Sequence, residues 1–67
     1  MSVAKVIEII ASSDKSFDDA VAQGVAQAGK SVENITSAWV QDHKVTVTKG
    51  AISEWRVNLK VTFVIKD

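Results

Sequence analysis

Trp39 and Arg56 are the two side chains of this 67-residue chain best suited to recognise a ligand. The indole of Trp39 could act as a platform on which a planar ligand stacks. The alternative is a contact between subunits, because aromatic residues are enriched at protein interfaces, and the residues alone favour this alternative. Arg56 could donate to an anionic or carbonyl-bearing ligand, or it could form an ion pair between subunits.

Metal binding and catalysis have weaker support. Asp14, Asp18 and Asp19 cluster in the sequence and could hold a hard cation such as calcium through oxygen ligands. Capping of a helix and compensation of its dipole explain the same residues more simply. His43 is the only histidine and is expected near the exposed end of a strand, as a surface residue rather than a ligand.

No pattern of catalytic residues is recognisable. The serines lack a histidine in a known catalytic context, and no two carboxylates suggest paired acid and base roles. Three scattered glycines do not form a phosphate-binding loop. We therefore expect a protein that is not an enzyme.

The length of the chain predicts one domain, residues 1–67, that needs a partner. A chain this short buries only about 60% of the surface that its unfolded form exposes, so it is marginally stable alone. Cysteine is absent, which excludes disulfides and thiolate metal sites. Association with further copies is the remaining common way to stabilise so small a domain.

Charge and hydropathy argue against several partners and compartments. Eight basic residues balance eight acidic ones and are scattered, so a nucleic-acid partner is not expected. No apolar stretch approaches the ~20 residues that span a bilayer. Lys5 and Glu8 interrupt the apolar N-terminal stretch, which therefore does not resemble a leader sequence, and we expect a cytoplasmic protein.

Hydrophobic periodicity predicts the order β-α-β-β. Residues 3–11 are rich in β-branched side chains on both faces, which indicates a strand covered on both sides. Ser16 is placed to cap a helix that runs towards Asn34, with one apolar stripe formed by Phe17, Val21, Val25, Ala28 and Val32. A second stripe, Ala22, Ala26 and Gly29, is either solvent-facing or a contact between subunits.

Two strands follow the helix. Ile35 to Thr48 forms the first, Lys49-Gly50 suits a tight hairpin, and the second alternates strictly, with Trp55 on its apolar side and Arg56 on its polar side. We expect the helix to cover one face of the sheet. Ser37, Trp39 and Gln41 are then expected to lie on the other face.

Most of the chain resembles the dodecin family. The resemblance rests on Lys5 to Ile10 with Ser12-Ser13, on Ser16-Phe17 and the alanine-rich helix, and on Val32 to Ile35 and Val57 to Phe63. It implies an α+β subunit, a three-stranded antiparallel sheet wrapped around one helix, and twelve subunits in a hollow homododecamer. It also implies storage of a flavin (FMN, riboflavin or FAD) without catalysis, the flavin stacking on a tryptophan and bonding to a glutamine.

The resemblance also shows where this chain departs from the flavin-binding members. An ungapped alignment puts Ser37 at the tryptophan position and Arg56 at the glutamine position, while Trp39 lies about 7 Å further along the same face. Val64 replaces an arginine that is frequent in bacterial members. The candidate ligand-binding residues are therefore Ser37, Trp39 and Arg56, in an altered flavin site. The alternative is a structural or calcium-associated assembly, since members without the tryptophan have been linked to calcium.

Overall fold

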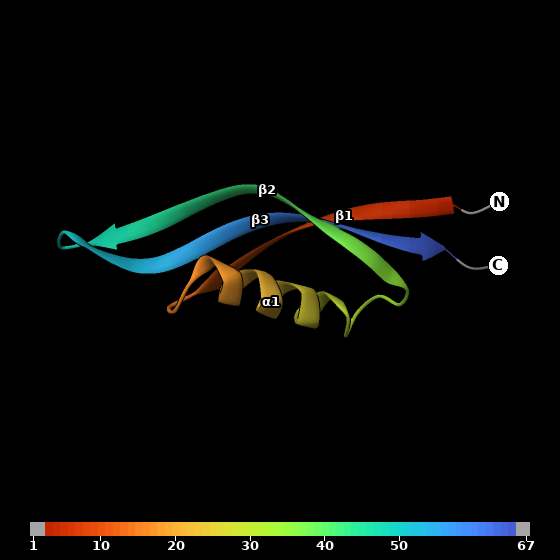
Figure 1. Ribbon diagram of the computed structural model, residues 1–67, viewed down its shortest axis with the longest axis horizontal. Coiled ribbons are helices and arrows are strands. Elements are labelled where there is room, and N and C mark those ends of the chain that lie inside the picture. The colour runs from red at the N-terminus through yellow and green to blue at the C-terminus, as the bar shows by residue number, and fades with distance from the viewer. Residues whose placement is uncertain (1–2, 66–67) are drawn as a thin grey trace.

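The computed structural model describes residues 3–65, which form one helix and three strands in the expected order (Figure 1). They are β1 (Val3–Ser13), α1 (Phe17–Ala28), β2 (Ile35–Thr48) and β3 (Ala51–Ile65). The strands form one antiparallel sheet in the order β1-β3-β2, and α1 covers one of its faces. The predicted α+β architecture is therefore confirmed.

The central strand β3 provides the core. Val57, Leu59 and Val61 point towards the helix and are almost fully buried. In the pairing of β1 with β3, Ile9 lies opposite Leu59, so its side chain shares this core face. Trp55, predicted to be a core residue, is only half-buried and lies at the end of this row.

The first turn of α1 is fixed by side-chain hydrogen bonds. The Oγ of Ser16 accepts from the backbone N–H of Asp19 at 3.0 Å, which confirms Ser16 as the N-cap. The helix ends at Ala28, so the predicted continuation through Val32 is wrong. The chain tightens beyond Gly29, where successive backbone N–H groups bond to carbonyls only three residues back, and Asn34 then takes a φ of 64°.

Small residues let the helix lie close to the sheet. Ala20, Gly24 and Ala28 are the buried positions of α1. A Cβ added at Gly24 would lie 2.9 Å from Cδ1 of Leu59 and 3.0 Å from Cβ of Ala11. The glycine is therefore required by side chains of the sheet. The other small stripe, Ala22, Ala26 and Gly29, lies on the exposed side of the helix.

The chain is more open than a typical compact monomer of its size. Its accessible surface is 4932 Å², whereas a folded monomer of 7.2 kDa exposes roughly 4,100 Å². Its radius of gyration is 13.8 Å against about 11 Å for a compact chain of this length. Figure 1 shows the cause: the β2–β3 hairpin extends well beyond both β1 and the helix.

Candidate functional site

The face of the sheet opposite the helix, here called the open face, carries the predicted site residues. Side chains directly opposite each other in an antiparallel pair share a face, so the register defines its rows. From one end to the other, the rows across β1, β3 and β2 are Val6, Thr62 and Ser37; Glu8, Lys60 and Trp39; Ile10, Asn58 and Asp42; and Ser12, Arg56 and Lys44.

Large apolar side chains are exposed on this face. Trp39 is 71% exposed and Ile10 is 72% exposed. Ser37, in the row beyond Trp39, is exposed as well. The prediction that Ser37 and Trp39 lie away from the helix is confirmed. Exposed apolar side chains of this size mark a surface that binds a ligand or another subunit.

Arg56 lies two rows from Trp39 and is held by an ion pair. Its Nη2 and Nε donate to Oε1 of Glu54 at 2.9 Å and 3.2 Å. Both side chains are partly exposed, so this pair adds little to stability and chiefly orients the guanidinium group. Arg56 also lies directly opposite Lys44, which places two cationic side chains next to each other on the open face.

A small cavity of about 90 Å³ adjoins Arg56, bounded by Ile10, Asp42, Lys44 and Asn58 among others. Oδ1 of Asn58 is buried there and has no hydrogen-bond partner among the described residues. A buried polar atom without a partner is costly, so a rotation of the Asn58 side chain that lets this oxygen accept a hydrogen bond would be favourable. The cavity thus combines cationic donors with one vacant acceptor.

Asp42, Lys44 and Asn58 also belong to this site, although no motif in the sequence pointed to them. The alternation of β3 was sufficient to place Asn58 beside Arg56. The positions on β2 were hidden by a β-bulge between Val40 and Asp42, which makes Gln41 an extra residue and shifts the alternation by one. Asp42 and Lys44 consequently share the open face with Trp39, whereas Gln41 has no partner on β3.

The same bulge turns His43 towards the helix side. His43 lies opposite Val57, and its ring meets that of Phe17 edge-on, with centroids 5.0 Å apart. The histidine is exposed at the surface, as expected. Its aromatic contact gives it a packing role at the start of α1.

One subunit does not bring the three predicted residues together. Trp39 lies opposite Lys60, which is four residues from Arg56 along β3, or about 13 Å. Ser37 lies opposite Thr62, which puts it about 20 Å from Arg56 along the strand. A single chain therefore presents an aromatic platform and a polar cavity as separate parts.

The acidic residues at the start of α1 serve the local structure. Oδ2 of Asp19 accepts from Oγ of Ser13 and from Nε2 of Gln23, both at 2.6 Å. The hydrogen bond from Ser13, and then that from Gln23, lower the pKa of Asp19 below its ordinary value. Within residues 3–65, no group of three or more acidic or histidine side chains is placed to hold a metal ion.

Known proteins similar to this chain in sequence belong to one family. A family model described as Dodecin matches residues 3–66. The calcium dodecin of Mycobacterium tuberculosis is 38% identical over 63 residues, which cover 94% of this chain and 89% of that protein. In the described part of the chain, the helix is too short and too polar to cross a membrane.

Solved structures agree with this result. A crystal structure of the calcium dodecin from M. tuberculosis, described as having a novel calcium-binding site, matches with a TM-score of 0.84 at 38% identity, covering 97% of this chain and 93% of that one. A dodecin from Streptomyces davaonensis matches with a TM-score of 0.94, covering 98% and 97% of the two chains. At 24% identity, the second likeness concerns the fold alone.

Proposed function

Because the chain belongs to the dodecin family, we propose that it is a non-enzymatic binding and storage protein that forms a homododecameric shell. The open face of the sheet is its ligand-binding surface. The observation that carries the proposal is the position of Trp39, a large aromatic side chain left 71% exposed on the face that the helix does not cover.

Association of subunits has independent physical support. The subunit exposes roughly 800 Å² more than a compact monomer of its mass, and a standard protein interface buries about 800 Å² of each partner. Among residues 3–65, only five apolar residues are buried in the core, which is little for a domain stable alone. Light scattering coupled to size exclusion tests this part, and a folded monomer at micromolar concentration would refute it.

A flavin fits the open face as a ligand shared between copies. Trp39 would provide the stacking platform, and Arg56 with Asn58 would hydrogen-bond a polar ring edge or an anionic side chain of the ligand. Since Trp39 and Arg56 are about 13 Å apart in one subunit, the ligand contacts them from two copies or contacts only one of them. The flavin itself supplies redox chemistry when bound, whereas this chain supplies binding and exclusion of solvent.

Flavin binding is tested by quenching of riboflavin, FMN and FAD fluorescence on titration with the protein. Trp39→Ala is expected to weaken binding about fivefold, because loss of a stacked aromatic contact costs on the order of 1 kcal/mol. Val6→Ala is the matched control, since Val6 is also an exposed apolar residue on the same face but does not border the cavity of Arg56. Absence of quenching at micromolar protein would exclude a flavin ligand, and equal effects of the two variants would exclude Trp39 as the platform.

A calcium-associated assembly is the second candidate. It is favoured by the 38% identity to a calcium dodecin. The described residues of one subunit lack a cluster of three acidic or histidine side chains, so the oxygen ligands would have to come from several copies or include backbone carbonyls. Equilibrium dialysis with calcium, with magnesium as control, tests it. No calcium bound at about 1 mM, the weak end for protein calcium sites, would refute this candidate.

A further inference from the structure

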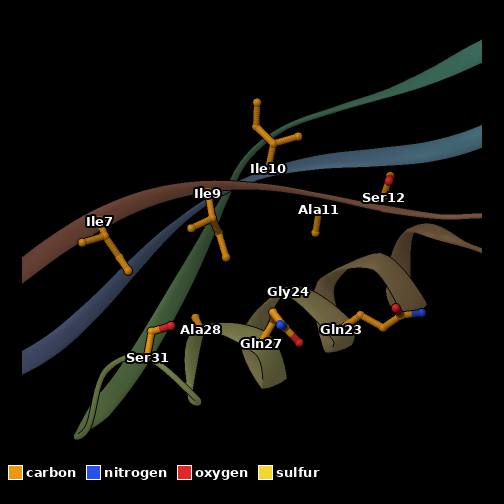
Figure 2. Close-up of a pocket in the computed structure, with 10 residues that line it drawn as sticks. All are labelled: Ile7, Ile9, Ile10, Ala11, Ser12, Gln23, Gly24, Gln27, Ala28 and Ser31. Atoms are coloured by element: carbon orange, nitrogen blue, oxygen red, sulfur yellow. The ribbon is translucent and has the colours of Figure 1, made fainter.

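A groove between β1 and α1 is open along one side of the subunit. It has a volume of about 470 Å³, and it exists because β1 is an edge strand of the sheet. Figure 2 shows Ile9 and Ala11 pointing towards the helix, where Gly24 and Ala28 form the opposite wall. Because Gly24 packs directly against Ala11, these side chains form an apolar floor where the strand meets the helix, and the groove lies over this floor.

Polar groups line the rim of this groove. Gln23 and Gln27 extend along its helix side in Figure 2, and Ser12 lies at one end. The outer edge of β1 has no neighbouring strand among residues 3–65. Unpaired backbone groups beside an apolar groove favour an extended segment, which can pair with the edge and insert side chains.

The tip of the β2–β3 hairpin is a segment of this kind. Trp55 is the last residue of β3 with a partner on β1, so residues 46–54, here called the arm, project beyond the rest of the sheet. Val47 lies opposite Ile52 in the arm, and they are 62% and 49% exposed. These two side chains form an apolar knob that contributes nothing to the core of their own subunit.

The arm is built to be rigid. Lys49 and Gly50 have φ angles of 54° and 79°, the positive values of a tight two-residue hairpin turn. The hydroxyl groups of Thr46 and Ser53 bond across the strands at 2.7 Å. A segment that is already ordered loses little conformational entropy when it docks.

We propose that the arm of one subunit docks in the β1–α1 groove of the next copy, with Val47 and Ile52 resting on the apolar floor where the strand meets the helix. Figure 1 shows the arm leading away from its own helix, so the groove that it fills belongs to another copy. The open face offers charged side chains such as Glu8, Lys60 and Arg56 in its central rows, so a concave apolar groove suits the knob better.

The contact is head-to-tail, because the arm and the groove are different surfaces. Such contacts repeat from copy to copy and close into a ring when the rotation between copies allows it. The inference rests on the proposed self-assembly and specifies which surfaces produce it. The excess exposed surface of roughly 800 Å² is what one copy would bury in a standard interface.

Cysteine cross-linking tests the contact directly, because the natural chain contains no cysteine. The double variant Ile52→Cys/Gln27→Cys is expected to form a ladder of disulfide-linked oligomers on mild oxidation. The matched control is Ile52→Cys/Ala22→Cys, since Ala22 lies on the exposed side of the helix, away from the groove. Each single variant can yield at most a linked dimer.

A second variant measures the energetic role of the knob. Val47→Asp/Ile52→Asp changes only exposed side chains, so circular dichroism should remain that of the folded subunit while light scattering shows smaller assemblies. If the cysteine variants still form the oligomer and the Ile52→Cys/Gln27→Cys and Ile52→Cys/Ala22→Cys pairs cross-link equally, the docking proposal is overturned, whereas the proposed self-assembly is not. A folded monomer of the natural chain would overturn both. A maleimide that labels Gln27→Cys in the oligomer as fast as Ala22→Cys would show that the groove is not covered.

Discussion

Replacement of Gly24 by alanine has two opposing effects on the free energy of unfolding, and the approximate size of each is known. In an exposed helix, this change stabilises by up to about 1 kcal/mol because glycine has the more flexible backbone. Here the new Cβ would lie 2.9 Å from Cδ1 of Leu59, and because Leu59 is fully buried its side chain would have to shift within the core. Overpacking of this kind costs roughly 1–3 kcal/mol, so after subtracting the full helical gain we expect a net loss of about 0–2 kcal/mol in the free energy of unfolding.

Gly29→Ala, at the C-cap of the same helix, is the matched control. Its φ is −63°, and the nearest atom to an added Cβ, the carbonyl oxygen of Ala26, is 3.4 Å away. This variant should be neutral or stabilising by up to about 1 kcal/mol. Urea unfolding followed by circular dichroism measures both variants, at one subunit concentration because association affects apparent stability.

A double-mutant cycle identifies the clash as the cause. Leu59→Val removes the methyl group that the new Cβ meets, so Gly24→Ala should be less destabilising in that background than in the natural chain. Equal costs in the two backgrounds would mean that Leu59 does not limit the approach of the helix. A Gly24→Ala variant as stable as Gly29→Ala would refute the close packing altogether.

Two further predictions concern the ends of α1 and β2. The lowered pKa of Asp19 stabilises the folded state when the carboxyl group is ionised, so this contribution is complete above the ordinary value of 3.8 and is lost as pH falls through the lower folded value. Asp19→Asn should therefore reduce stability at pH 7 and show a smaller deficit at pH 2.5 in urea titrations; an equal deficit at both would contradict the ionic role. Gly50→Ala should cost about 1 kcal/mol of stability by the same assay, because a φ of 79° disfavours a side chain even though no atom lies within 4 Å. Lys49→Asn should raise stability, since Asn-Gly suits this turn.

Local patterns in the sequence were sufficient for the elements and for part of the site. The cap at Ser16, the turn at Lys49-Gly50 and the alternation of β3 depend on residues within a few positions of one another, and all three were predicted correctly. The uncovered position of Trp39 also followed from the alternation of its strand. The exposed apolar side chains of β1 agree with the expectation that its second face needs cover.

The remaining features depended on contacts between segments distant in the sequence. The end of α1 at Ala28 was overestimated because the apolar spacing continues to Val32, although the backbone turns away there. The bulge at Gln41 is a property of how β2 pairs with β3, and no local motif marks it.

The sequence by itself determined which side chains are available: an aromatic platform at Trp39, a cation at Arg56 and polar residues alternating with them. Only the tertiary structure decided how they are grouped. The shift at Gln41 brings Lys44 and Asp42 to the cavity of Arg56, while the length of the strands keeps Trp39 about 13 Å away. The physical reason is that strand register is fixed by pairing across the sheet, whereas the sequence specifies only the alternation along each strand.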